Sequence, residues 1–196
     1  MTSVIHLIVE NSFIIGDETD EDMDRVQHFD NEGKIIQESG FGPAILNYCK
    51  YQERCHWEVR NKLYELGCGK DESEEQISRL IGKGILNEER YAKAYAGGKF
   101  RMNHWGREKI KQQLKLRKIS DYCIKKGLAE IEADDYEKML EKLTNKKIVE
   151  LKSERNQIIK YRKTYKYLVQ KGYERDMVID IINNKLKSNT DKSIFP

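Results

Sequence analysis

Two stretches that lie 45 residues apart, Leu86-Asn-Glu-Glu-Arg-Tyr91 and Ile131-Glu-Ala-Asp-Asp-Tyr136, share one pattern and decide the fold. Each begins with an aliphatic residue, has two adjacent acidic residues in its middle part, and ends on a tyrosine. A further large side chain, Tyr95 or Leu140, follows one helical turn later. Asn87 is placed to cap a helix, and the acidic residues after it suit the positive end of a helix dipole. The repeated pattern indicates an array of similar helical units.

A second repeated feature consists of apolar pairs four residues apart on both sides of a turn. The turns fall at Gly67–Gly69, at Lys118 and at Gly172, and corresponding residues are 51 and then 54 positions apart. In chain order the pairs are Val59 and Leu63 with Ile77 and Ile81, Ile110 and Leu114 with Ile124 and Leu128, and Thr164 and Leu168 with Val178 and Ile182. We expect one long and two shorter helices in each unit. A unit of about 50 residues barely buries enough apolar surface to fold alone, so neighbouring units must stack.

The composition agrees with a helical chain. Among 196 residues there are only 2 prolines, Pro43 and Pro196, so the chain between them lacks the residue that breaks helices outright. We predict an all-α fold of three tandem three-helix repeats in an elongated curved array, with a short acidic N-terminal appendage that is a β-hairpin or disordered. The expected divisions are the appendage (1–42), three helical repeats (43–85, 86–130 and 131–188) and a C-terminal tail (189–196).

The N-terminal appendage differs from the rest of the chain in charge. Residues 1–42 hold 10 acidic and 2 basic residues, a net charge of −8, whereas residues 43–196 hold 34 basic and 23 acidic residues, a net charge of +11. The acidic run from Asp17 to Asp24 repels itself and should stay solvated. Short β-like stretches are expected at 4–9, 12–15, 25–29 and 34–37, with a hairpin turn at 30–33.

Several classes of protein find no support in the sequence. No apolar run approaches the ~20 residues of a membrane helix, and the first ten residues lack the charged start and cleavage site of a secretory signal. No Cys-x-x-Cys pair occurs, so we expect reduced thiols rather than zinc or disulfides at Cys49, Cys55, Cys68 and Cys123. These features predict a soluble cytoplasmic protein without a cofactor.

Catalytic motifs are also missing. The four histidines have no serine, acid or cysteine at a spacing that suggests a catalytic triad. Gly97-Gly98 lies inside a helical pattern and lacks the following Lys-Ser/Thr that would complete a phosphate-binding loop. We therefore predict that the chain is not an enzyme.

The strongest functional signal is the positive charge between Lys99 and Lys126. This segment holds ten basic residues against only Glu108 and Asp121. Such a density attracts phosphates or an acidic protein groove. A solvated helix face is the plainer interpretation, but balanced surfaces normally mix both signs, which favours binding. The candidate contact residues are Lys99, Arg101, Trp105, Arg107, Lys109, Lys111, Lys115, Arg117 and Lys118.

Aromatic residues give a weaker signal. The run Lys160–Tyr167 alternates bases with tyrosines that could stack on nucleobases, but their helical spacing favours core packing. Trp57 and Trp105 each follow a histidine at an expected helix start. For both tryptophans, anchoring of the helix N-terminus is favoured over base stacking.

Three motifs resemble the family of the bacterial regulatory protein RecX. They are Glu58-Val-Arg-Asn-Lys-Leu63, Leu86-Asn-Glu-Glu-Arg-Tyr-Ala-Lys-Ala-Tyr95, and Lys99-Phe-Arg-Met-Asn-His-Trp-Gly-Arg-Glu-Lys-Ile110 followed by Gln113-Leu114. The resemblance extends over about 45–186. It implies three tandem three-helix repeats in a cytoplasmic modulator of the RecA recombinase. It further implies binding in the groove of the RecA filament on single-stranded DNA, inhibition of strand exchange and ATP hydrolysis, and a place in DNA recombination, repair and the SOS response.

The residues themselves suit such a partner, because a basic rod without catalytic groups fits a deep groove lined by acidic protein and phosphate. Asn87 stands where the family often has aspartate, although asparagine also caps helices, and residues 1–42 have no counterpart in the family. We expect a monomer that binds the RecA filament, and weak direct binding to DNA is compatible with this expectation. The alternative is a basic helical nucleic-acid-binding module without a recombinase partner.

Overall fold

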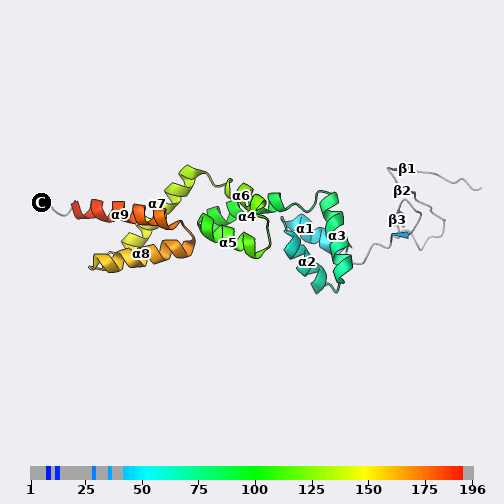
Figure 1. The fold of residues 1–196 in the computed structure, drawn as a ribbon, viewed down its shortest axis with the longest axis horizontal. Coiled ribbons are helices and arrows are strands. Elements are labelled where there is room, and N and C mark those ends of the chain that lie inside the picture. Colours follow the sequence, from blue (N-terminus) through cyan, green and yellow to red (C-terminus); the bar gives the residue numbers. More distant parts are fainter. Residues whose placement is uncertain (1–7, 10–11, 14–27, 30–34, 37–41, 192–196) are drawn as a thin grey trace, which may run out of the picture.

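The structure, a computed structural model, describes residues 8–9, 12–13, 28–29, 35–36 and 42–191 (Figure 1). In the N-terminal part, β1 (Ile8–Val9) pairs antiparallel with β2 (Ser12–Phe13), and β3 (His28–Phe29) pairs antiparallel with β4 (Ile35–Ile36). These two pairs lie within the expected β-like stretches. The acidic run 17–24 and the expected turn at 30–33 lie outside the described residues.

Residues 42–191 form nine helices in three groups, which follow one another as an elongated row (Figure 1). The helices are α1 (Gly42–Tyr51), α2 (His56–Glu65) and α3 (Lys70–Gly82) in unit 1; α4 (Glu88–Asn103), α5 (Arg107–Leu116) and α6 (Asp121–Leu128) in unit 2; and α7 (Ala133–Glu150), α8 (Gln157–Lys171) and α9 (Arg175–Asp191) in unit 3. The predicted all-α, elongated array is confirmed.

The expected helix lengths are found in units 1 and 2 but not in unit 3. Unit 2 has one long helix of 16 residues and shorter ones of 10 and 8 residues, and unit 1 has one of 13 residues and two of 10 residues. Unit 3 instead has three long helices of 18, 15 and 17 residues. The helices of unit 3 can lengthen because no glycine or proline interrupts residues 133–171.

The second helix of every unit ends in the same way, which gives the repeat its physical basis. A residue with a left-handed backbone follows the helix: Gly67 (φ 88°), Lys118 (φ 60°) and Gly172 (φ 93°). The next N–H then donates to the carbonyl of a buried leucine five residues earlier, at 3.0–3.2 Å, in the pairs Cys68–Leu63, Ile119–Leu114 and Tyr173–Leu168. This geometry satisfies carbonyls that a helix end would leave unpaired.

The predicted apolar pairs form the core, with two corrections. Ile81 is 44% exposed, and Leu80 is buried in its place. The exchange is possible because residues three apart, such as Ile77 and Leu80, share a helix face as well as residues four apart do. Leu128 is only half-buried. All the other predicted members are buried.

The buried residues form two clusters rather than three. One lies within unit 1, and the other runs without a break through units 2 and 3. Cys55, immediately before α2, is fully buried in this second cluster and so links unit 1 to unit 2. The described structure is therefore a small first body packed against a larger second one.

Units 2 and 3 meet through their backbones, end to end. The N–H of Gly106 donates to the carbonyl of Lys171 at 2.8 Å, and the N–H of Glu108 donates to the carbonyl of Gly172 at 3.0 Å. The free amides at the start of α5 thus satisfy the free carbonyls at the end of α8. A Cβ on Gly106 would lie 2.1 Å from the Gly172 carbonyl oxygen, so only glycine allows this approach.

Unit 1 meets unit 2 through side chains as well as through Cys55. Arg90 on α4 forms an ion pair with Glu53 at 2.5 Å and donates to the carbonyl of Ile85. His56 on α2 lies 3.3 Å from the carboxylate of Glu88. Side-chain contacts of this kind are weaker and more sensitive to salt than the backbone junction between units 2 and 3.

Substitution by alanine should change the free energy of unfolding in opposite directions at Gly106, which lies in the junction, and at Gly98, which lies inside α4. Gly106→Ala should lower the free energy of unfolding by on the order of 3 kcal/mol, because the added methyl group collides with backbone atoms that cannot move aside. Gly98→Ala, inside α4 with open space around it, should raise the free energy of unfolding by about 0.5–1 kcal/mol. Chemical denaturation followed by circular dichroism measures both. A Gly106→Ala variant as stable as the native chain would contradict the described junction.

Candidate functional site

The basic candidates lie on or next to unit 2, whose local sequence fixes its helices. The side chain of Asn87 accepts a hydrogen bond from the N–H of Arg90 at 2.9 Å, so the predicted cap of α4 is confirmed. Ile110 and Leu114 are fully buried, as expected for α5. The remaining positions of α5 are therefore available to polar side chains, and these divide into residues that hold the units together and residues that face solvent.

Arg107 belongs to the junction between units 2 and 3. Its guanidinium donates to the carbonyl of Ile131 at 3.0 Å and lies 4.1 Å from the ring centre of Tyr136. The Tyr136 hydroxyl accepts from the backbone N–H of Arg107 at 3.0 Å and donates to the carboxylate of Glu174 at 2.5 Å. Burial, reinforced by this carboxylate, raises the pKa of Tyr136, which keeps the phenol neutral.

Arg117 plays a similar part between units 1 and 2. Its guanidinium donates to the carbonyl of Gln113 at 2.8 Å and lies 4.9 Å from the ring centre of Tyr95. Its Nε is 3.6 Å from the carboxylate of Glu58 on α2, which also accepts from the hydroxyl of Tyr91 at 3.0 Å. One carboxylate of unit 1 is thus held by an arginine and a tyrosine of unit 2.

Trp105 lies in the loop between α4 and α5 rather than inside a helix. Its half-buried ring packs against the larger core, and two ammonium groups sit near it: that of Lys99 at 5.4 Å and that of Lys109 at 4.6 Å from the ring centre. Lys99 also lies 5.3 Å from the ring of Tyr95. These cation–π contacts attach both lysines to the protein surface.

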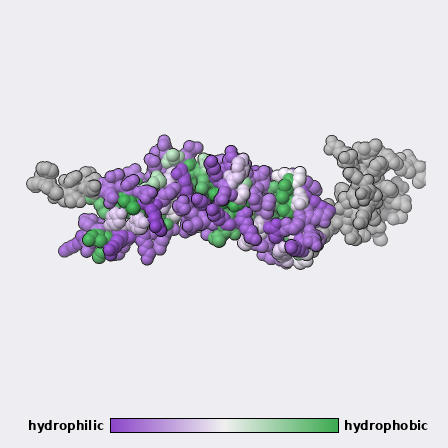
Figure 2. All heavy atoms as spheres, viewed as in Figure 1, coloured by the Kyte–Doolittle hydropathy of each residue, from purple (hydrophilic) through white to green (hydrophobic). Residues whose placement is uncertain are grey.

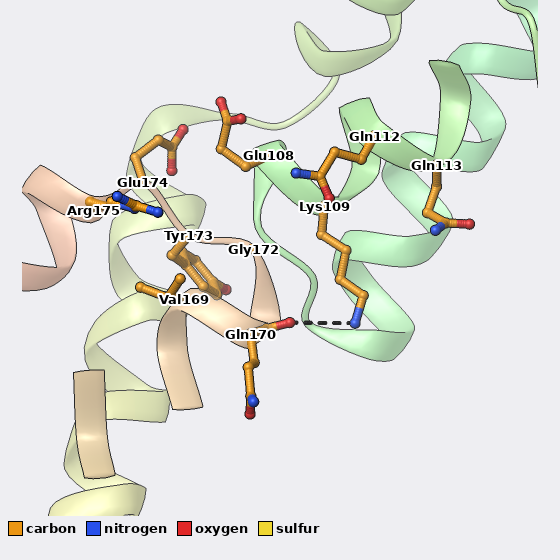
Figure 3. Close-up of a pocket in the computed structure, with 10 residues that line it drawn as sticks. All are labelled: Glu108, Lys109, Gln112, Gln113, Val169, Gln170, Gly172, Tyr173, Glu174 and Arg175. Atoms are coloured by element: carbon orange, nitrogen blue, oxygen red, sulfur yellow. Dashed lines mark hydrogen bonds between the residues drawn. The ribbon is translucent and has the colours of Figure 1, made fainter. Parts of the chain in front are cut away.

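Lys109 is engaged twice. Besides its contact with Trp105, its ammonium donates to the carbonyl of Gln170 at 3.4 Å across the junction (Figure 3). Lys109 and Gln170 both line a groove of about 560 Å³ between α5 and the α8–α9 turn. The groove is lined by Glu108, Lys109, Gln112, Gln113, Val169, Gln170, Gly172, Tyr173, Glu174 and Arg175 (Figure 3). Its lining mixes both signs of charge, so it is not an anion site.

The other four candidates are not built into the fold in this way. Arg101 is exposed and reaches back over Gly97. Lys111 and Lys115 lie one turn apart on α5, and Lys118 follows at the turn. Lys115 lies 3.3 Å from the exposed carboxylate of Asp121. Within the described part of the chain, Lys111 and Lys118 have no ion pair. We call Lys111, Lys115 and Lys118 the α5 lysine face.

Known proteins resemble this chain both in unit 2 and over most of the helical array. Residues 87–128 match the family model for the second three-helix domain of RecX. The chain is 29% identical over 139 residues to the regulatory protein RecX of Haemophilus influenzae (strain PittGG), a match that covers 70% of this chain and 90% of that protein. Unit 2 thus matches the RecX family, and the chain is similar to RecX proteins over most of its length.

Two further RecX proteins are also similar to this chain. The regulatory protein RecX of Clostridium perfringens (strain 13 / Type A) is 32% identical over 126 residues, which cover 64% of this chain and 58% of that protein. The crystal structure of RecX from Lactobacillus salivarius superposes with a TM-score of 0.65 at 27% identity, over 73% of this chain and 92% of that one. The resemblance to RecX expected from the three sequence motifs is confirmed, and so is the helical array.

Two other properties concern the described residues alone. No helix among them is long and apolar enough to cross a membrane. No group of three or more potential metal ligands comes together in the same part of the chain. The four cysteines are free, and burial raises the pKa of the Cys49 thiol to about 11.

The residues that complete the two junctions could not be predicted from the sequence. Glu58 lies within a family motif that does not indicate its partners, and nothing in the sequence around Glu174 indicates a contact with Tyr136. Tyr91 and Tyr136 were recognised as a repeated feature, which was a usable signal: a tyrosine that recurs at the start of a helix often anchors a polar contact when buried.

Two substitutions separate the structural candidates from the solvent-facing ones. Arg107→Lys should lower the free energy of unfolding by about 1–2 kcal/mol, because lysine lacks the planar fork that reaches the Ile131 carbonyl while it covers the Tyr136 ring. Lys111→Gln should change it by less than about 0.5 kcal/mol. Urea denaturation of both variants checks this, and equal losses would contradict the division.

Proposed function

We propose that this chain regulates the RecA recombinase by binding along the groove of the RecA filament on single-stranded DNA, and that it inhibits strand exchange and ATP hydrolysis. It acts as a monomeric binding protein rather than an enzyme. The observation that carries the proposal is an elongated row of units whose second member presents the α5 lysine face, in which Lys111 and Lys118 form no ion pair with any residue that the structure describes. Similarity to regulatory proteins RecX supports the same conclusion.

Elongation and stiffness supply the inhibitory mechanism. The backbone junction between α5 and α8 makes units 2 and 3 one body, so a contact made by either unit fixes the position of the other. A stiff body that touches more than one subunit of a helical filament opposes the small rotations and additions that the filament needs. Inhibition in this mechanism is steric and requires no catalytic group in the chain.

Charge on unit 2 supplies affinity and rapid association. A filament groove lined by phosphate and acidic protein attracts the α5 lysine face, and such attraction steers encounters. Because Lys115 and Lys118 are exposed and Lys111 is only half-buried, their contribution should weaken as salt is added. Arg107 and Arg117 serve a different purpose, since the Arg107 guanidinium bonds the Ile131 carbonyl at one junction and that of Arg117 pairs with Glu58 at the other.

A nucleic-acid-binding module without a recombinase partner is the alternative, and the same lysine face favours it. Phosphates would attract these side chains in bare DNA as well. The two functions predict different relative affinities. A filament regulator binds the RecA filament more tightly than it binds the same single-stranded DNA without RecA. A simple DNA-binding module would bind bare DNA at least as well.

Charge reversal tests the contribution of the α5 lysine face. The triple variant Lys111→Glu, Lys115→Glu, Lys118→Glu should require at least about tenfold more protein to inhibit RecA-catalysed strand exchange, because repulsion replaces attraction. A control variant reverses three exposed lysines outside unit 2, Lys70, Lys83 and Lys142, and has the same net charge. It should inhibit nearly as well as the native chain.

Helical circular dichroism should be the same for both variants, since none of the six lysines lies in a core. Full inhibition by the α5 variant would remove the proposed role of this face. An equal loss in both variants would show that only net charge matters.

A further inference from the structure

The free end of unit 3 exposes aliphatic side chains that the fold does not use. This end, where α7 stops and α8 begins, carries Val149 at 65%, Ile158 at 64% and Ile159 at 39% exposure. Figure 2 shows a hydrophobic patch over the start of α8, surrounded by hydrophilic residues. None of the three residues belongs to either core cluster. We call Val149, Ile158 and Ile159, with the turn that joins them, the unit 3 tip.

The tip is held by specific hydrogen bonds. The side chain of Asn156 caps α8 by accepting from the N–H groups of Ile158 at 2.9 Å and Ile159 at 3.2 Å. The carboxylate of Glu154 accepts from the N–H of Asn156 at 3.2 Å and pairs with Lys163 at 3.1 Å. Because two N–H groups at the start of α8 are bonded to the Asn156 side chain, the side chains of Ile158 and Ile159 are held in one orientation. This order lowers the entropic cost of binding a partner.

The charge around the tip is strongly positive. Residues 146–166 hold eight basic residues and two acidic ones. Both acids are already paired inside the protein, Glu150 with Lys147 at 3.0 Å and Glu154 with Lys163. Six basic residues remain to face a partner: Lys146, Lys152, Arg155, Lys160, Arg162 and Lys166.

This combination fits an acidic protein surface better than a nucleic acid. Single-stranded nucleic acids are held by aromatic rings that stack on the bases, whereas the exposed side chains of the tip are aliphatic. The nearest tyrosines of α8, Tyr161 and Tyr165, are half-buried and stack on each other with ring centres 6.3 Å apart. An apolar centre with a charged rim is the usual arrangement of a protein–protein contact.

We propose that the unit 3 tip is a second docking point for a protein partner. Ile158, Val149 and Ile159 would enter an apolar pocket of that partner, and acidic residues would surround the pocket. The inference rests on the proposed function, under which the partner is a RecA subunit other than the one that faces the α5 lysine face. The rigid junction between units 2 and 3 holds the two docking points at a fixed separation. That separation would tie one filament subunit to another.

The test compares the tip variant Val149→Ser, Ile158→Ser with a control, Tyr51→Ser, Ile81→Ser, which removes exposed apolar side chains from unit 1. Fluorescence anisotropy of the labelled chain measures binding to RecA filaments on single-stranded DNA with a non-hydrolysable ATP analogue, and to the same DNA without RecA. The tip variant should bind the filament about tenfold more weakly, as expected when a central apolar contact is lost. The control should bind like the native chain, and affinity for bare DNA should be the same for all three proteins.

Each other outcome has a defined meaning. Unchanged filament affinity of the tip variant overturns the inference. A parallel loss of affinity for bare DNA assigns the tip to nucleic acid and also overturns it. If the native chain does not bind the filament, the proposed function and the inference are both overturned. If the native chain and the tip variant both bind normally, only the inference is overturned. Because both tip residues are exposed, the free energy of unfolding of the tip variant should match that of the native chain.

Discussion

The end-to-end contact of α8 with α5 is the constraint on which the rest of the structure depends. Two backbone hydrogen bonds, from Gly106 to Lys171 and from Glu108 to Gly172, let the amides that open one helix satisfy the carbonyls that close another. The contact needs a glycine at position 106, because any side chain would collide with the opposite backbone. It merges two small helical units into one body with a continuous core. The α5 lysine face and the unit 3 tip therefore keep fixed positions relative to each other.

The positive charge of unit 2 is used in two ways. Arg107 and Arg117 use planar, weakly hydrated guanidinium groups to bond carbonyl oxygens and cover tyrosine rings, and each also contacts a neighbouring unit, at Ile131 and at Glu58. Lysine carries a compact and strongly hydrated charge, which favours a place in solvent, as at Lys115 and Lys118, although Lys99 and Lys109 are held against aromatic rings. A high local count of basic residues thus contains two populations, and only the solvent-facing one is available to a partner.

Features set by near neighbours in sequence could be predicted, and those set by distant ones could not. The Asn87 cap, the buried Ile110–Leu114 face and the turn at Gly172 each depend on residues within a few positions, and all three were expected. The inward placement of Arg107 and Arg117 depends on Ile131 and Glu58, which lie 24 and 59 positions away. Periodicity alone placed Ile81 in the core, where Leu80 is found. The unit 3 tip could not be predicted, because two adjacent isoleucines, Ile158 and Ile159, have the composition of a buried helix face but are exposed.

The central claim is that the chain regulates RecA filaments, and ATP hydrolysis by RecA on single-stranded DNA tests it most directly. The native chain would be titrated from far below the RecA concentration upward. A stiff body that ties filament subunits together should inhibit hydrolysis when it is present at much less than one copy per RecA subunit. Hydrolysis that stays unaffected, while the chain binds bare single-stranded DNA tightly, would contradict the claim and favour a nucleic-acid-binding module.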